Sequence, residues 1–192
     1  MGICFKQLDK LHVSQDVLNG FDCGHPDFNV FLREDAITCA SNGEGVTYIL
    51  VDEDELAGDI TTIMAFATIK TTALYYKIDE RLLSESCAEI KYFAIAKPFQ
   101  KTRTGKNGVE KYFSTVFFEY LLMDLYELST SVIGFTGIFL RANENGLKLY
   151  KRKNFIDATD FMIPFEEDDE LGKCMAMYLP ISSNLYSIFG VE

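Results

Sequence analysis

Residues 87–140 contain the pattern that most restricts the fold of this chain. An alternating strand is expected at 87–96 (CAEIKYFAIA), followed by a basic loop at 97–108 and by apolar residues at helical spacing over 109–128. A second apolar strand is expected at 132–140 (VIGFTGIFL). A strand, a helix and a strand in this order form a β-α-β unit with parallel strands and a right-handed crossover. The sequence therefore predicts an α/β or α+β fold with a mixed sheet.

The rest of the chain is predicted to contribute further strands and short helices to a single domain, 1–192. Asn107 and Glu110 are expected at the N-cap and N3 positions of the long helix, and Ser14 or Asp16 at the start of a short one. The remaining expected strands are at 3–9, 45–52, 60–70 and 173–179. The remaining expected helices are an amphipathic one at 26–40 capped by Asp27, a helical connection at 78–85 and a helix at 143–153 capped by Asn143.

Composition excludes several classes of protein. No run of 18 apolar residues is present and the N-terminus lacks the basic and apolar regions of a secretory signal, so we expect a cytoplasmic protein with no membrane contact. The five cysteines are widely spaced, and the two histidines lie far in sequence from most of them, which predicts reduced thiols and no metal site.

The charge of the chain is unevenly distributed. The net charge is −11, yet segments 97–111 and 147–153 each carry about +4, which leaves about −19 on the rest. An acidic body with two short basic segments favours a local polyanion site over a nucleic-acid surface. The alternative is chance clustering of surface lysines.

The loop at 97–108, KPFQKTRTGKNG, is the first candidate for an anion site. It joins a strand to the start of a helix, where unpaired amides and the helix dipole favour negative charge. Gly105 and Gly108 would let a ligand come close to the backbone. The P-loop pattern and the dinucleotide-binding glycine pattern are both absent from the sequence, which disfavours a nucleoside triphosphatase or an NAD enzyme.

Residues 137–155, GIFLRANENGLKLYKRKNF, carry a resemblance to a known family. A strand, an Asn-rich turn, a helix with Tyr150 and then Asn154-Phe155 follow one another. This order resembles the last conserved segment of the GNAT-type N-acetyltransferases, roughly strand, A-N-x-x-A-x-x-x-Y-x-x-x-G-F. Asn154 stands where the family usually has Gly, and Asn tolerates the left-handed backbone expected there.

The resemblance implies a mostly antiparallel sheet with one splayed parallel strand pair, flanking helices and acetyl-coenzyme A as cosubstrate. Its pyrophosphate loop, Q/R-x-x-G-x-G/A, is matched imperfectly: Arg103 takes the first position read back from Gly108, Lys106 replaces the middle Gly, and two residues are inserted after Gln100. The backbone of the strand at 87–96 would polarise the acetyl carbonyl. The implied cofactor-binding residues are Phe93, Ala94, Ile95, Gln100, Arg103, Thr104, Gly105, Lys106, Asn107, Gly108 and Asn143.

Two side chains are candidates for proton transfer in such an enzyme. A neutral phenol at Tyr150 would donate a proton to the leaving thiolate, and Glu89 at the start of strand 87–96 would take a proton from the amine. A water chain could replace the base, and Tyr150 could instead be a core residue. His12 and His25 are expected to be structural.

A second stretch narrows the resemblance to a subgroup. Residues 20–36, GFDCGHPDFNVFLREDA, resemble the opening of GNAT proteins that include toxins of bacterial toxin–antitoxin pairs, which modify aminoacyl-tRNA. The acidic body opposes nucleic-acid binding. The run 157–170, with seven acidic residues and no basic one, would attract a cationic amine, or is a solvated loop.

The sequence therefore predicts an N-acetyltransferase that acts by direct attack in a ternary complex. The acceptor is a primary amine on a small molecule or peptide, with aminoacyl-tRNA as a further option. The alternative is a non-catalytic acyl-coenzyme A-binding module with the same fold. The sequence is compatible with a homodimer, and it leaves open whether an antitoxin-like partner exists.

Overall fold

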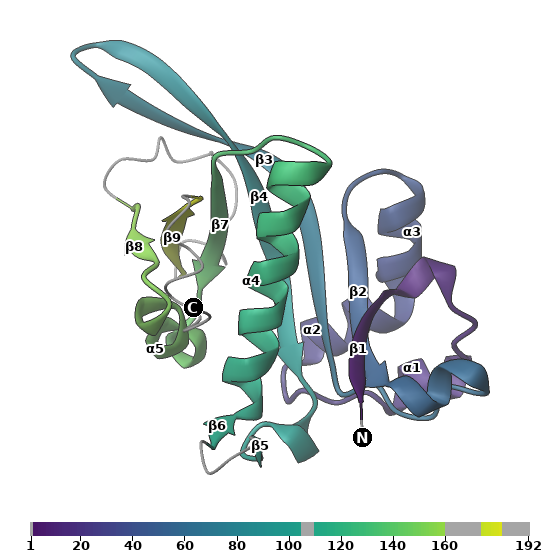
Figure 1. Cartoon of the computed structure of the whole chain (residues 1–192). Helices are drawn as coiled ribbons and strands as arrows, with labels where there is room; N and C mark the ends of the chain where they lie inside the picture. Colours follow the sequence, from purple (N-terminus) through teal and green to yellow (C-terminus); the bar gives the residue numbers. More distant parts are fainter. Residues whose placement is uncertain (1, 105–109, 160–173, 182–192) are drawn as a thin grey trace. The chain divides into compact units, whose positions relative to one another are not determined.

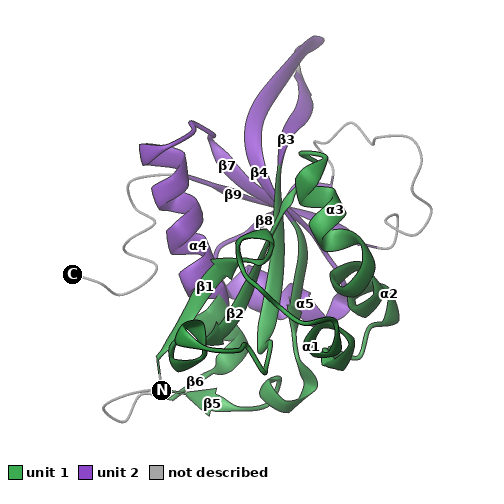
Figure 2. Cartoon of the chain, turned by 90° about the vertical axis from the view of Figure 1, so that its right-hand side faces the viewer, with its two compact units in different colours: residues 1–70, 91–117 green, residues 71–90, 118–192 purple. Residues whose placement is uncertain are grey.

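The structure is a computed structural model that describes residues 2–104, 110–159 and 174–181. It divides into two compact units, residues 1–70 with 91–117 (unit 1) and residues 71–90 with 118–192 (unit 2), shown in Figure 2. Strands β3 (Ala65–Ile78) and β4 (Arg81–Ile95) and helix α4 (Phe113–Ser131) contribute to both units. The predicted single domain therefore stays a prediction.

The sheet has the predicted mixed character. Its described strands, labelled in Figure 1, follow the order β1 (Ile3–Gln7), β2 (Val46–Asp52), β3, β4, β7 (Gly137–Ala142), β9 (Met175–Pro180) and β8 (Ile156–Asp157). The ladders of β2 with β1 and β3, and of β9 with β7 and β8, are antiparallel, whereas β4 pairs with β7 in parallel from Cys87↔Gly137 to Ile90↔Leu140. The parallel pair predicted from the β-α-β pattern is thus confirmed.

Unit 1 begins with β1 (Ile3–Gln7), a 3-10 turn (Leu8–Lys10) and α1 (Gln15–Gly20). Ser14 caps α1, because its side chain accepts a hydrogen bond from Val17 N at 3.4 Å. The predicted helix at 26–40 consists of α2 (Pro26–Val30), a π-helical turn (Phe31–Asp35) and α3 (Ala36–Ser41). The cap predicted at Asp27 is wrong, because Pro26 takes the first helical position and His25 precedes it.

The core of unit 1 follows the alternation of its strands. Ile49 and Val51 of β2 (Val46–Asp52) face the layer formed by the N-terminal helices, where Leu18, Phe31 and Leu32 are buried. Leu50, between them, faces the start of α4 with Phe113 and Phe117. Because successive side chains of a strand point to opposite faces, one strand can serve two hydrophobic layers. After β2, a 3-10 helix (Glu53–Ala57) precedes residues 60–64, which were predicted as strand but have no regular secondary structure, so that β3 begins at Ala65.

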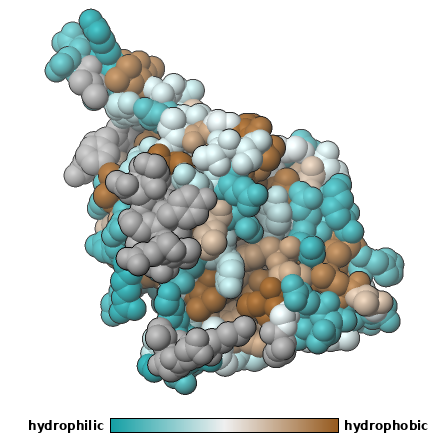
Figure 3. All heavy atoms as spheres, in the orientation of Figure 1, coloured by the Kyte–Doolittle hydropathy of each residue, from teal (hydrophilic) through white to brown (hydrophobic). Residues whose placement is uncertain are grey.

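The helical connection predicted at 78–85 is wrong. β3 and β4 continue past the β2 ladder, whose last pair is Val46↔Ile69, as a long two-stranded arm (Figure 1). Asp79 and Glu80 turn the chain with φ values of 47° and 67°. Two left-handed residues fit the tight hairpin turn that follows strand twist, although Gly and Asn are the usual occupants. The arm exposes Leu82 and Leu83, and Figure 3 shows hydrophilic residues at its tip with a hydrophobic patch next to them.

The long helix starts later than its apolar spacing predicts. A 3-10 turn (Lys97–Phe99) follows β4, and Arg103–Thr104 (β5) then pairs with Lys111–Tyr112 (β6) in a small hairpin. Helix α4 therefore begins at Phe113, and Glu110 is not its N3 residue as predicted. Asn107, the predicted cap, lies outside the described residues. None of the helices in the described ranges is long and apolar enough to span a membrane.

Unit 2 contains the predicted strand–helix–strand order at its C-terminal end. β7 (Gly137–Ala142) starts five residues later than predicted, and α5 (Glu144–Arg152), β8 (Ile156–Asp157) and β9 (Met175–Pro180) follow. A core cluster includes Leu74, Cys87, Phe139 and Ala176. Residues 132–134, predicted as strand, are exposed, with Val132 76% accessible.

Candidate functional site

The last residues of β4 present alternate side chains to two aromatic layers. The ring of Phe93 stacks on Phe117 of α4, with centroids 5.1 Å apart, whereas the ring of Tyr92 lies 4.1 Å from that of Phe31. Ala94 and Ile95 are buried in the two corresponding core clusters. The alternation predicted for this strand is therefore confirmed. It determines the orientation of the backbone N–H and C=O groups that, by the resemblance, would contact the cofactor.

The sequence Phe21-Asp22-Cys23-Gly24 forms a turn that holds the loop after β4. Lys97 donates a hydrogen bond from Nζ to Asp22 Oδ2 at 2.6 Å, and the Lys97 amide donates to the Asp22 carbonyl at 2.8 Å. Gly24 N, in a left-handed conformation at φ 86°, donates to Asp22 Oδ1. The Lys97 hydrogen bond, with a smaller effect from the Gly24 amide, lowers the pKa of Asp22 to about 2. One of the loop's basic charges is thus neutralised.

Gln100 ties the end of β4 to the same turn. Its Nε2 donates to Ile95 O at 2.9 Å and to Cys23 O at 2.7 Å. An amide nitrogen has two hydrogens, so this group is fully used by the protein. The cofactor contact predicted for Gln100 stays a prediction, and only its Oε1 is left to make it.

Arg103 is held by the β5–β6 hairpin. Its guanidinium lies over the ring of Tyr112, 5.0 Å from the centroid, and 3.9 Å from Glu110 Oε2. A hydrogen bond with Tyr112 raises the pKa of Arg103. Thr104 is exposed beside it in β5. The other predicted loop residues, Gly105, Lys106, Asn107 and Gly108, lie outside the described residues.

In unit 2, the ends of α5 match the sequence prediction closely. Asn143 is the N-cap, and its Oδ1 accepts a hydrogen bond from Gly146 N at 3.0 Å. After the helix, Asn154 has φ 62°, which is the left-handed conformation predicted for it. Both local predictions are confirmed, because capping and chirality depend on short-range geometry.

Tyr150 is buried in a cluster of aromatic rings. It is 8% exposed, and its ring lies 5.1 Å from that of Phe118 and 6.0 Å from that of Phe155. Burial raises the pKa of its phenol above the ordinary value, so the group stays protonated at physiological pH. Its hydroxyl makes no hydrogen bond within the described ranges.

A buried ion pair lies next to this cluster in sequence. Lys153 Nζ donates to Glu119 Oε1, and the two side chains are only 10% and 14% exposed. Lys153 therefore cannot belong to the exposed basic segment predicted at 147–153, whereas Lys148, Lys151 and Arg152 are exposed. The pair joins the end of α5 to α4 within unit 2.

Glu89 lies in the parallel ladder opposite Phe139 and is half-buried. Burial, with smaller effects from the charges of Glu85 and then Glu89, raises the pKa of the Cys87 thiol to about 11. The structure thus places Glu89 with Asn143 and Tyr150 in unit 2, and Phe93, Ala94, Ile95, Gln100, Arg103 and Thr104 in unit 1. The predicted acidic run at 157–170 is described only at Asp157–Thr159. The described part contains no cluster of candidate metal ligands.

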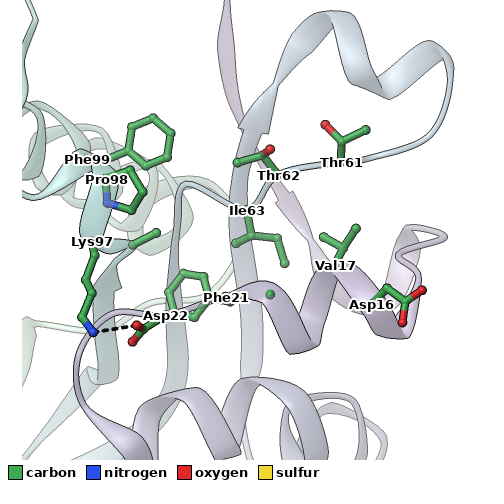
Figure 4. Close-up of a pocket in the computed structure, with 12 residues that line it drawn as sticks. Asp16, Val17, Phe21, Asp22, Thr61, Thr62, Ile63, Lys97, Pro98 and Phe99 are labelled. Atoms are coloured by element: carbon green, nitrogen blue, oxygen red, sulfur yellow. Dashed lines mark hydrogen bonds and ion pairs between the residues drawn. The ribbon is translucent and has the colours of Figure 1, made fainter.

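A pocket of about 580 Å³ opens in unit 1 beside the Asp22–Lys97 pair (Figure 4). Its apolar lining residues include Phe21, Ile63 and Phe99, and its polar ones include Asp16, Thr61 and Thr62. Because Lys97 is paired with Asp22 and Asp16 has no ion-pair partner in the described part, the lining is net negative. This charge disfavours an anionic ligand such as a phosphate.

The topology described above, with one parallel pair in a mostly antiparallel sheet and a helix crossover, is the GNAT fold. A structure of a bacterial toxin matches with a TM-score of 0.71 over 100% of this chain and 97% of that chain, at 14% identity. AtaT complexed with acetyl-methionyl-tRNAfMet matches with a TM-score of 0.68 at 17% identity, covering 99% and 100%. A mutant AtaT toxin bound to the C-terminus of the antitoxin AtaR and acetyl-CoA matches with a TM-score of 0.63 at 19% identity, covering 97% and 95%.

No protein-family model matches the chain, and no curated protein matches it in sequence. The three-dimensional likeness to toxins of this fold confirms the predicted fold class and the predicted resemblance.

Sequence reasoning missed three residues that shape the site. Asp22 and Lys153 form ion pairs across 75 and 34 residues, for which a single sequence gives no signal. Gly146 was missed although a signal exists, because a glycine inside a helix is unfavourable and usually has a packing reason.

Proposed function

We propose that this protein is an N-acetyltransferase that moves the acetyl group of acetyl-coenzyme A to a primary amine. The observation that carries the proposal is Tyr150, a buried phenol that stays protonated and whose hydroxyl has no partner in the described part. A proton donor in this state suits a departing thiolate. A matched structure of the same fold contains bound acetyl-CoA, which supports the choice of cosubstrate.

Unit 1 supplies groups that fit acetyl-coenzyme A. Residues Phe93–Ile95 would offer backbone groups to the pantetheine arm and acetyl carbonyl, and the loop after β4 would hold the pyrophosphate. Of the described loop residues, Lys101 is exposed, and Arg103 keeps an exposed guanidinium edge beside Tyr112. The alternating core contacts of Phe93 and Tyr92 hold the strand rigidly, which a backbone binding site requires.

The proposed reaction is a direct transfer. The ammonium loses one proton to Glu89 or to water, and the neutral amine nitrogen attacks the thioester carbonyl carbon. The nitrogen then releases its second proton to water, the carbon–sulfur bond breaks, and the sulfur takes the phenolic proton of Tyr150. The products are the acetylated amine and the free thiol of coenzyme A, and Tyr150 recovers its proton from solvent.

The acceptor is proposed to be a cationic small molecule or peptide. The net charge of −11 and the negative lining of the pocket at Asp16 favour a positively charged ligand. Aminoacyl-tRNA remains in the acceptor panel, because a matched AtaT structure contains acetyl-methionyl-tRNAfMet. We place the reaction in the cytoplasm, in keeping with five free cysteines. A homodimer or an antitoxin-like partner would be compatible with this function.

A second candidate is a module that binds acyl-coenzyme A without transferring the acyl group. It is favoured by the loop after β4, where Lys97 is neutralised by Asp22 and the Gln100 amide is occupied by two carbonyls. A loop with fewer available donors would hold the pyrophosphate less firmly than the family pattern implies.

Two measurements separate these candidates. Calorimetry with acetyl-coenzyme A, coenzyme A and ATP tests the cofactor, and only the first two should bind. Thiol release with acetyl-coenzyme A and a panel of polyamines, basic peptides and aminoacyl-tRNA then tests transfer. Binding with thiol release supports the enzyme, binding without it supports the module, and no heat with acetyl-coenzyme A would refute both.

A further inference from the structure

The ring of Tyr150 packs directly on the backbone of α5, one helical turn before it. A Cβ added at Gly146 would lie 2.5 Å from Tyr150 Cε2, 2.9 Å from Cζ and 3.0 Å from Oη. Carbon contacts this short do not occur, so any side chain at position 146 requires the ring or the helix to move. The observed position of the phenol therefore requires a glycine at position 146.

The ring has little room to move away. Phe118 and Phe155 lie on its other sides at centroid distances of 5.1 and 6.0 Å, and Tyr150 is 8% exposed. Closely packed rings of this kind resist displacement, because a shift would force neighbouring side chains out of their rotamers. A methyl group at position 146 would consequently change the position of the hydroxyl, which lies 3.0 Å from the added Cβ.

The packing also determines where the hydroxyl points. Helical side chains are directed toward the helix N-terminus, and Oη lies over Gly146 in the first turn of α5. Asn143 already occupies the Gly146 amide, whereas the first two amides of a helix have no carbonyl within it. The hydroxyl thus points toward the positive end of the helix, where a nearby negative charge is favoured, and the Glu144 carboxylate in the same turn opposes this effect.

We propose that Gly146 is a positioning residue for proton donation by Tyr150. This inference rests on the proposed function. Gly146 stands where the family pattern A-N-x-x-A has its second alanine, so this chain departs from the pattern at the residue that touches the phenol. The glycine costs helix stability and in return lets the hydroxyl lie against the first turn of α5.

A double-mutant cycle with Tyr150→Phe tests the proposal, because phenylalanine keeps the ring and removes only the hydroxyl. In the wild-type background Gly146→Ala should lower kcat about 10- to 100-fold, as expected for a reacting group displaced by about 1 Å. The KM for acetyl-coenzyme A should change less than about twofold. In the Tyr150→Phe background Gly146→Ala should lower Tm by the same amount but leave kcat unchanged.

The outcomes separate the inference from the function on which it rests. If Tyr150→Phe retains full kcat, the proton-donor role fails and the positioning role falls with it. If Tyr150→Phe loses activity but Gly146→Ala retains it, or if Gly146→Ala lowers kcat equally in both backgrounds, only the positioning role is overturned. Gly134→Ala, whose added Cβ would meet no atom within 4 Å, is the matched control and should change neither kcat nor Tm.

A second variant covers the case in which Gly146→Ala does not fold. Phe118→Leu replaces the ring packed against Tyr150 with a smaller side chain and so makes room for the displaced phenol. Gly146→Ala is then assayed in the Phe118→Leu background, where it should again lower kcat about tenfold or more relative to Phe118→Leu alone. Equal kcat values for these two proteins would overturn the inference.

Discussion

Lys97 Nζ donates a hydrogen bond of 2.6 Å to the carboxylate of Asp22, a residue 75 positions earlier in the chain. The same carboxylate accepts hydrogen bonds from Gly24 N at 2.8 Å and Asn29 Nδ2 at 3.1 Å. Asp22 therefore joins the turn after α1 to the first residue of the loop that would hold the cofactor's phosphates. This contact holds the Phe-Asp-Cys-Gly turn against the start of the basic loop.

Replacing Asp22 with Asn should lower Tm by a few degrees, because Lys97 loses the carboxylate that anchors the loop after β4. The pKa of Asp22 is lowered from 3.8 to about 2 by Lys97 and then by Gly24, so the folded state favours the ionised form. Its contribution should be complete above pH 4 and vanish as the pH falls toward 2. Thermal unfolding of both proteins between pH 2 and 7 checks this. Asp59→Asn, an exposed substitution in the same unit, is the control, and a Tm difference that does not depend on pH would contradict the prediction.

Tyr150→Phe should lower kcat about 100-fold or more while Tm stays within about a degree. Stability should be kept because the hydroxyl has no partner in the described part to lose, and the ring contacts remain. Since burial raises the pKa of this phenol, the wild-type enzyme should show no loss of kcat through Tyr150 ionisation up to about pH 10. Initial-rate measurements from pH 6 to 10 test both points, and a basic limb that Tyr150→Phe removes would contradict the second.

Lys153→Ala should destabilise the protein by about 3–5 kcal/mol, because it removes the Lys153 ammonium from the buried Glu119 carboxylate. The double substitution Lys153→Met with Glu119→Leu removes both charges and should recover most of this loss. Urea unfolding at neutral pH measures the free energy of each variant. Lys151→Ala, on the exposed side of the same helix, should have little effect. A double variant as unstable as the single one would show that the pair itself contributes the stability.

Gly137→Ala should destabilise unit 2 by about 1–3 kcal/mol through overpacking. The Tyr178 ring from β9 lies across this glycine, and an added Cβ would come within 2.5 Å of Tyr178 Oη. Gly134→Ala, three residues earlier and without atoms within 4 Å of its added Cβ, should leave Tm unchanged. Equal Tm values for the two variants would contradict the packing role.

Asn154→Gly should keep or slightly raise stability, whereas Asn154→Ala should cost about 1–2 kcal/mol. The reason is the left-handed backbone at φ 62°, which Asn and Gly tolerate and alanine does not. Urea unfolding of both variants tests it. A neutral Asn154→Ala would indicate that the turn can adopt another conformation.

The sequence by itself determined the features that depend on neighbours in the chain. Helical spacing predicted the long helix α4. The Asn143 cap and the Asn154 turn predicted the two ends of α5. The strand–helix–strand order predicted the parallel pairing of β4 with β7. These follow from backbone sterics, capping hydrogen bonds and handedness, which act over a few residues. The same patterns led to the toxin-like GNAT resemblance that the structural comparisons confirm.

Only the tertiary structure decided which of those residues are available for chemistry. The Asp79–Glu80 turn extends two strands where a helix was predicted, and a small hairpin delays α4 to Phe113. Lys97 and Lys153 form ion pairs with carboxylates far away in sequence. The Tyr150 hydroxyl, in contrast, has no hydrogen-bond partner in the described part. A charge or a hydroxyl acquires its role from the groups packed around it, and those contacts arise between segments whose proximity no local pattern encodes.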